Sequence, residues 1–239
     1  MESGTTGRQR TPLDRGRVAD TALRLLNETG LDGLTLRAIA RELDVKAPAL
    51  YWHFKDKQAL LDEMATEMYR RMVAGTALDP ADTWRERLLR MNRGLRAALL
   101  GYRDGARVFS GSRFTGAVHA EQMEQTLGLL TAAGFTLAQA VAATNTTYLF
   151  TLGFVTEEQG VEPRPGERRE GYDLAERASA MAGYPLTAAA GPEIFADYDR
   201  RFAEGLALIV DGVAARYGVG RPDRGPVSGS GTAPPAVAG

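Results

Sequence analysis

One short segment near the N-terminus combines small, basic and aromatic side chains. A helix that enters the major groove of DNA needs small, polar or aromatic residues on its outward face. The segment supplies them, and Lys57, just beyond it, is placed to meet a phosphate. The candidate DNA-contacting residues are Lys46, Ala47, Ala49, Tyr51, Trp52 and His53, together with Lys57.

The sequence contains few of the residues and motifs on which enzymatic catalysis depends. The chain has no cysteine and two histidines, His53 and His119, and it lacks nucleophile-elbow, phosphate-loop and HExxH motifs. Glu157 and Glu158 form the one possible acid-base pair, without an identifiable partner. We therefore expect no enzyme, no metal site and no cofactor, and for His53 packing or a backbone contact outweighs metal binding.

Helical periodicity dominates, so the predicted fold is all-α, with a three-helix helix-turn-helix domain followed by a larger helical domain. The first helix is expected to end near Gly30, and the second and third are joined by a turn at residues 44–45. Pro48 suits the first turn of the third helix, because a backbone amide at that position has no partner within the helix and proline lacks the amide hydrogen. The predicted N-caps of the first, second and fourth helices are Asp14, Thr35 and Asp56.

Beyond a Gly- and Pro-containing boundary at residues 75–82, longer amphipathic helices are expected. Their predicted ranges are 84–100, 117–132, 136–158, a weaker helix at 172–181 and a long final helix at 192–217, with a loop at 160–170. The predicted domain organisation is a flexible arm at 1–13, a DNA-binding domain at 14–60, a ligand-binding and dimerisation domain at 61–217 and a disordered tail at 218–239.

Composition is that of an ordinary globular protein. Of 239 residues, 44% are hydrophobic and 25% charged, and the net charge is -1. Residues 1–57 carry ten Lys or Arg against eight Asp or Glu, so charge alone does not indicate nucleic acid. Neither a secretory signal nor a membrane-spanning stretch is apparent, and we expect a cytoplasmic protein with no membrane partner.

The run LTLRAIARELDVKAPALYWHFKDKQALLD, residues 34–62, closely resembles the DNA-binding motif of the TetR family. Further similarity to the tetracycline-repressor branch of that family lies at residues 98–113, 134–137 and 150–159, so that the resemblance covers roughly residues 14–160. It implies a dimeric regulator whose effector, bound to the larger domain, changes the separation of two recognition helices. The helices predicted at 136–159 and 192–217 are the candidate dimer interface, and the second offers the apolar residues Leu206, Leu208, Ile209, Val210 and Val213. For each of these five residues, packing in the internal core is the alternative.

The resemblance also implies roles for individual residues. Thr35, Pro48, Tyr51 and Lys57 would contact mainly phosphate or sugar, and Arg37 would read a base, a contact worth about 1 to 3 kcal/mol of discrimination. Alanines 47 and 49 stand where the tetracycline repressors place glutamine and threonine, which predicts a different operator. The alternatives are that Tyr51 and Phe54 pack the small core and that Arg37 is an ordinary solvated residue.

In the larger domain, Phe109 aligns with the histidine that binds magnesium in the tetracycline repressors, although Arg113 and Glu157 match retained residues. We therefore expect neither magnesium dependence nor a tetracycline response. The predicted ligand-binding residues are Val73, Met91, Leu95, Phe109, Arg113, Met123, Thr126, Phe154 and Glu157. For each apolar member, ordinary core packing is the alternative.

Together these features predict a ligand-responsive repressor that binds a palindromic operator as a homodimer and is released by a small apolar or aromatic effector. The alternative is a DNA-binding regulator that has no small-molecule effector or that acts as an activator.

Overall fold

The computed structural model describes residues 13–76, 78–164 and 166–219. These residues form eleven helices and no strand, apart from one isolated bridge between Arg164 and Glu167. The predicted all-α class is confirmed. The predicted N-terminal arm and C-terminal tail lie almost entirely outside the described residues. None of the helices in the described ranges has the length and apolar character needed to cross a bilayer.

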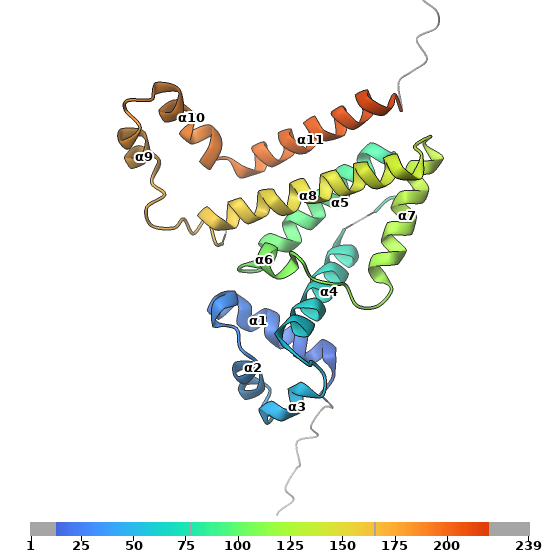
Figure 1. Ribbon diagram of the computed structural model, residues 1–239, viewed down its shortest axis with the longest axis vertical. Helices are drawn as coiled ribbons and strands as arrows, with labels where there is room; N and C mark the ends of the chain where they lie inside the picture. Colours follow the sequence, from blue (N-terminus) through green and yellow to red (C-terminus); the bar gives the residue numbers. More distant parts are fainter. Residues whose placement is uncertain (1–12, 77, 165, 220–239) are drawn as a thin grey trace, which may run out of the picture.

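The first three helices and the start of the fourth form a small unit at one end of the molecule (Figure 1). All three predicted N-caps are confirmed: Asp14 accepts a hydrogen bond from the Arg17 amide, Thr35 from that of Ala38 and Asp56 from that of Ala59. Gly30, with a φ of 71°, kinks the first helix near its predicted end. The ranges are α1 (Arg15–Gly33), α2 (Leu36–Glu42), α3 (Ala47–Tyr51) and α4 (Lys57–Gly75).

The next four helices make the body of the larger unit. Two of them begin with a reciprocal capping box, Thr83 with Glu86 and Thr136 with Gln139. A five-residue helix that periodicity did not predict lies between the first and third of the four. The ranges are α5 (Trp84–Leu100), α6 (Gly105–Phe109), α7 (Val118–Ala132) and α8 (Leu137–Val161).

The prediction of one final helix over 192–217 is wrong, because the chain breaks at Asp197. This residue adopts a left-handed conformation with a φ of 47° and caps the last helix through the Arg200 amide. Pro192 lies inside the preceding helix, and Pro185 occupies its first turn instead. The observed helices are α9 (Leu174–Ala180), α10 (Pro185–Phe195) and α11 (Tyr198–Tyr217).

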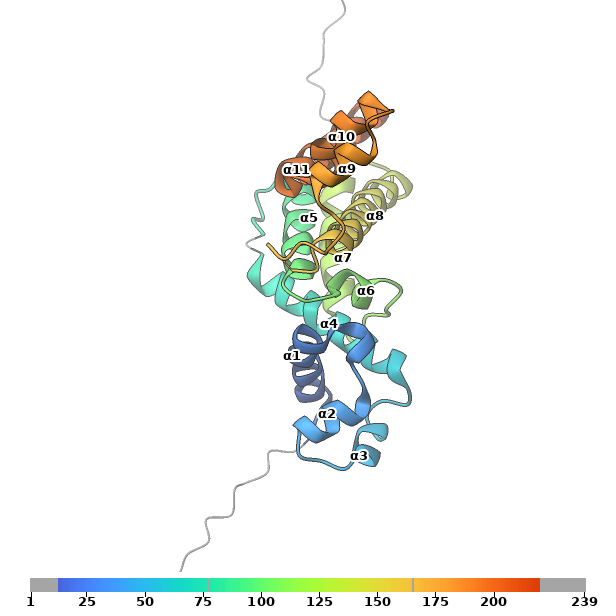
Figure 2. The same ribbon diagram turned by 90° about the vertical axis from the view of Figure 1, so that its left-hand side faces the viewer.

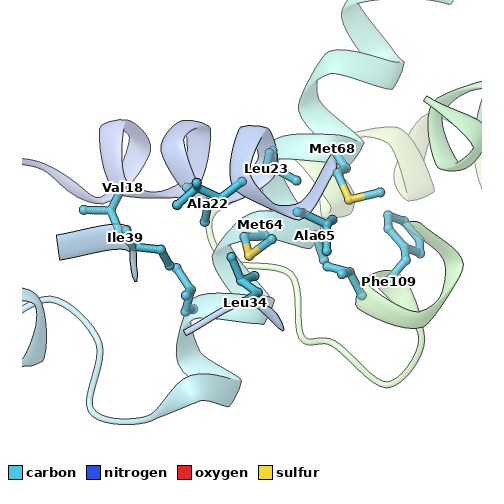
Figure 3. Close-up of a cluster of buried hydrophobic side chains, with 14 of the residues drawn as sticks. Val18, Ala22, Leu23, Leu34, Ile39, Met64, Ala65, Met68 and Phe109 are labelled. Carbon is cyan, nitrogen blue, oxygen red and sulfur yellow. The ribbon is translucent and has the colours of Figure 1, made fainter. Parts of the chain in front are cut away.

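A continuous apolar cluster runs from the small N-terminal unit into the larger one. Figure 3 shows Val18 and Ile39 at one end of this cluster, the α4 residues Met64 and Met68 along it, and Phe109 of α6 at the other end. All five side chains are at most 2% exposed. Helix α4 therefore packs against both units. The predicted division at residue 60 stays a prediction.

Figures 1 and 2 show α8 and α11 side by side at the far end of the molecule from α2 and α3, with α9 and α10 at the outer end of this pair. The contact is apolar and aromatic: Phe150 of α8 stacks on Phe202 of α11 at 5.7 Å between ring centroids. Leu206 and Val210, predicted to supply dimer surface, are instead buried within the chain, whereas Leu208 is 74% exposed.

Candidate DNA-binding surface and ligand cavity

Helices α2 and α3 are joined by a tight turn that the backbone fixes locally. Asp44 has a φ of 52°, and the Val45 amide donates to the Ala40 carbonyl at 3.0 Å. Leu50 and Phe54 anchor the following helix because both are fully buried. The packing alternative for Phe54 is thus confirmed. Tyr51, at 56% exposed, points away from the core, so that alternative is wrong for Tyr51.

The ten residues predicted to contact DNA lie on or beside these two helices, and none of them is buried. Trp52 has 90% of its surface exposed, and Arg37 and Lys46 are exposed without a carboxylate partner among the described residues. Two of the residues predicted to contact DNA already use their side chains in hydrogen bonds within the chain: Thr35 caps α2, and the Lys57 ammonium donates to the Leu31 carbonyl at 3.2 Å. The exposed members are Thr35, Arg37, Lys46, Pro48, Tyr51, Trp52 and Lys57, and the half-buried ones are Ala47, Ala49 and His53.

A cavity of about 460 Å³ lies in the larger unit, enclosed by α4, α5, α6, α7 and α8. Its wall is mainly apolar and aromatic. The lining residues are Tyr69, Met72, Leu88, Met91, Asn92, Leu95, Phe109, Phe114, His119, Gln122, Met123, Thr126, Leu127, Val141, Thr144, Asn145 and Tyr148.

Five of the nine predicted ligand-binding residues lie in this wall: Met91, Leu95, Phe109, Met123 and Thr126. The other four lie outside it. Phe154 faces α11, with its ring 5.3 Å from that of Phe202. Arg113 is exposed, and its backbone amide donates to Asp62. Glu157 is exposed, and Val73 packs against the core shared with the N-terminal unit.

Sequence reasoning missed the aromatic side of the cavity. Phe114 stacks on His119 at 4.6 Å between ring centroids, and both rings lie within 5.4 Å of Tyr69. One signal was present: His119, Gln122, Met123 and Thr126 follow the i, i+3, i+4, i+7 spacing of one helix face. Phe114 and Tyr69 carry no comparable signal, since they reach the cavity from a loop and from α4.

The cavity wall carries no formal charge at neutral pH. None of the described residues that line it is Asp, Glu, Lys or Arg. Burial lowers the pKa of His119, which favours the neutral imidazole, and burial raises the pKa of Tyr69 to about 12. The Asn92 side chain is engaged internally, because its amide nitrogen donates to the Leu88 carbonyl and its oxygen accepts from Thr151. The wall therefore suits an uncharged ligand.

Two exposed short helices joined by a tight turn, followed by a larger helical unit that holds a cavity, are typical of helix-turn-helix regulators, and family models match both parts. Residues 18–64 match the model described as bacterial regulatory proteins, tetR family, and residues 76–217 match that described as tetracyclin repressor-like, C-terminal domain. The chain belongs to the TetR family. It is a transcription regulator with a helix-turn-helix and a ligand-binding domain, and not an enzyme.

Individual relatives narrow the resemblance. The chain is 42% identical over 220 residues to the tetracycline repressor protein class A from transposon 1721 of Escherichia coli, covering 92% of this chain and 99% of the relative. Among solved structures, it is similar to a possible TetR family transcriptional regulator from Streptomyces coelicolor A3(2), with a TM-score of 0.74, 40% identity and coverage of 85% and 100%. A variant of TetR from Acinetobacter baumannii AYE, in complex with minocycline, gives a TM-score of 0.66 at 33% identity, with coverage of 86% and 98%.

Proposed function

We propose that this protein is a ligand-responsive transcriptional repressor that binds a palindromic operator as a homodimer and is released by a small apolar or aromatic molecule. The observation that carries the proposal is the uncharged, mainly apolar and aromatic cavity, which α4 links directly to the unit that holds α2 and α3. Ligand pockets of this size and lining bury most of a small molecule's surface and orient it by a few polar groups.

On the DNA side, Arg37 is the proposed base reader. It is exposed near the start of α2, no carboxylate of the described part of the chain pairs with it, and a guanidinium forms two hydrogen bonds with guanine O6 and N7. Thr35, Pro48, Tyr51 and Lys57 position the helix on the phosphate backbone without reading sequence. Ala47 and Ala49 offer methyl contacts in place of an amide, so the operator differs from that of the resembled repressors. The remaining proposed contacts are Lys46, Trp52 and His53.

For the homodimer, α8 and α11 are the proposed interface. They pack against each other within the chain and still expose large apolar side chains: Leu149 is 54% exposed and Leu208 is 74% exposed. A second copy would cover this surface, and two-fold symmetry would set the spacing of the recognition helices to match an operator palindrome. Sedimentation of a monomer at micromolar concentration would contradict this part.

On the effector side, the proposal differs from the activity in the relatives' names. Phe109, 2% exposed, forms part of the cavity wall where the resembled repressors place a metal-binding histidine. An apolar ring supplies no ligand to a divalent cation, which prefers oxygen or imidazole donors. The proposed ligand contacts are therefore Met91, Leu95, Phe109, Met123 and Thr126, to which the cavity adds Tyr69, Phe114, His119 and Gln122.

The test is a mobility shift on DNA from upstream of the gene and its neighbours. It is run with uncharged aromatic compounds and, separately, with tetracycline plus magnesium. Release by an aromatic compound without magnesium supports the proposal. Release by tetracycline that requires magnesium contradicts the effector assignment. Specific binding that no compound releases indicates a regulator without a small-molecule effector.

A further inference from the structure

A buried carboxylate on α4 belongs to neither the DNA surface nor the cavity wall. Glu63 is 8% exposed and accepts hydrogen bonds from two segments that are far apart in the sequence. Arg15 Nε of α1 donates to Glu63 Oε2 at 2.7 Å. Thr115 Oγ1, in the loop after α6, lies within hydrogen-bond distance of the same oxygen at 3.3 Å and of Thr66 Oγ1 at 3.2 Å. A buried charge is costly unless paired and hydrogen-bonded, so Glu63 depends on both partners.

Arg15, the first of these partners, connects Glu63 to α3, the proposed recognition helix. Arg15 Nη1 donates to the His53 carbonyl at 2.8 Å, and the guanidinium lies 4.7 Å from the centroid of the Phe54 ring. Both contacted residues lie just beyond Trp52, the C-cap of α3, and their amides donate to the Leu50 carbonyl in the last turn of that helix. Arg15 therefore fixes the C-terminal end of α3, and Glu63 fixes Arg15.

Thr115, the second partner, connects Glu63 to the cavity wall. Thr115 is tied to α4, because its amide donates to Thr66 Oγ1 at 2.8 Å. The preceding residue, Phe114, lines the cavity and stacks on His119. A ligand that displaces Phe114 together with its backbone also moves the neighbouring Thr115, and with it the hydroxyl that donates to Glu63.

We propose that Glu63 is the positioning residue through which the cavity wall acts on the recognition helix, in the sequence Phe114, Thr115, Glu63, Arg15 and the His53 carbonyl. The inference rests on the proposed function for its regulatory meaning. When Thr115 withdraws, Glu63 keeps Arg15 as its remaining partner from outside α4. The carboxylate is then less firmly positioned, and the hydrogen bond from Arg15 to the His53 carbonyl weakens. In the ligand-free protein the same contacts keep α3 in place for DNA.

The first experiment needs neither DNA nor ligand, because it follows amide hydrogen exchange across α3 in the free full-length protein. Thr115→Val, Glu63→Gln and Arg15→Gln are each expected to speed exchange at His53 and Phe54 by about tenfold. The matched controls are Ser112→Ala, which removes a hydroxyl that among the described residues bonds only the Val108 carbonyl, and Glu67→Gln, which removes a carboxylate one turn along α4 that pairs with Arg70 and Arg71. Both controls should exchange like the wild type.

The decisive variant combines Thr115→Val with Arg15→Gln. The two residues share no contact except through Glu63, so the double variant should exchange no more than about twice as fast as either single variant. Independent effects would multiply to about a hundredfold, and that result would overturn the inference. Wild-type exchange in Thr115→Val would overturn it as well.

A second measurement separates this inference from the proposed function. Operator binding is titrated with 1,8-dihydroxyanthraquinone, a flat and largely uncharged aromatic probe, in the wild type and in Thr115→Val. A probe that releases the wild type at least fivefold more effectively than the variant supports both proposals. If α3 loosens in the variants while no compound releases the wild type, the Glu63 coupling stands and ligand release fails. Equal release with unchanged exchange overturns the coupling alone.

Discussion

The candidate DNA-binding surface and the candidate ligand cavity are built from residues at different separations along the chain. Over residues 35–57, the turn and caps are fixed by hydrogen bonds between residues three to five positions apart, such as Ala38 to Thr35 and Val45 to Ala40. The cavity draws side chains from Tyr69 to Tyr148 on five helices. The surface therefore depends on local geometry, whereas the cavity exists only when long helices pack in one arrangement.

This difference has a consequence for substitutions. At the surface, candidate DNA-binding side chains and core side chains alternate along one short segment. Substituting one of two neighbouring residues should therefore change DNA binding without changing stability, or the reverse. In the cavity, the side chains that meet a ligand also pack against one another. Four predictions probe this contrast, from the largest expected effect to the smallest.

The largest effect is expected for Phe54→Ala. The ring is fully buried beneath Arg15, and its removal should lower the free energy of unfolding by about 3 to 5 kcal/mol. Urea unfolding followed by circular dichroism measures this loss. Trp52→Ala, two positions away and 90% exposed, is the matched control and should unfold like the wild type. Equal losses for both variants would contradict the separation of core and surface.

Next in size is Arg37→Ala. Loss of a two-pronged guanine contact should weaken specific operator binding by about 1 to 3 kcal/mol while leaving non-specific binding and stability nearly unchanged. Fluorescence anisotropy on operator and scrambled DNA gives both affinities. Arg93→Ala, an exposed arginine of α5, should bind operator normally. If Arg37→Ala retained full operator affinity, Arg37 would be an ordinary solvated residue.

A smaller effect is expected when the cavity is filled. Met123→Trp places an indole in the wall and should weaken binding of an uncharged aromatic compound by about tenfold, equivalent to about 1.4 kcal/mol, without changing operator affinity. Isothermal titration calorimetry gives the compound's affinity. Phe154→Leu changes a ring outside the cavity and should bind the compound like the wild type. If Phe154→Leu weakened binding of the compound and Met123→Trp did not, Phe154 would be a ligand-binding residue, as the sequence predicts.

The smallest effect concerns pH. Burial lowers the pKa of His119 below its ordinary 6.5, so the unfolded chain takes up a proton more readily than the folded protein does. Stability contributed by the neutral imidazole is present above pH 6.5 and falls as the pH drops toward the folded pKa. Thermal unfolding between pH 7.5 and 5.5 should thus show a steeper decline in the wild type than in His119→Gln. Parallel declines would mean that His119 titrates alike in both states.

Elements specified by nearby residues could be predicted from the sequence. The three N-caps, the turn before α3 and the burial of Phe54 follow from hydrogen bonds and periodicity within one helical turn or two. The resemblance to the TetR family begins in the same segment and continues into the larger domain, and family models match residues 18–64 and 76–217. The contacts that these residues make with DNA remain predictions.

Periodicity identifies that a helix has an apolar face and leaves open which neighbour covers it. Phe154 was assigned to the cavity, yet its face of α8 packs on α11. The final helix continued through Asp197 in the sequence pattern, because no glycine or proline marks the break; the local signal there is Asp197 itself, whose side chain caps α11.

By itself, the sequence determined the all-α class, the helix-turn-helix and the absence of enzyme motifs, since each depends on residue type and short spacing. Only the tertiary structure decided the composition of the cavity and the links of Glu63 to both Arg15 and Thr115. Those contacts join segments separated by about fifty residues, and their geometry arises when α1, α4 and the loop after α6 pack together.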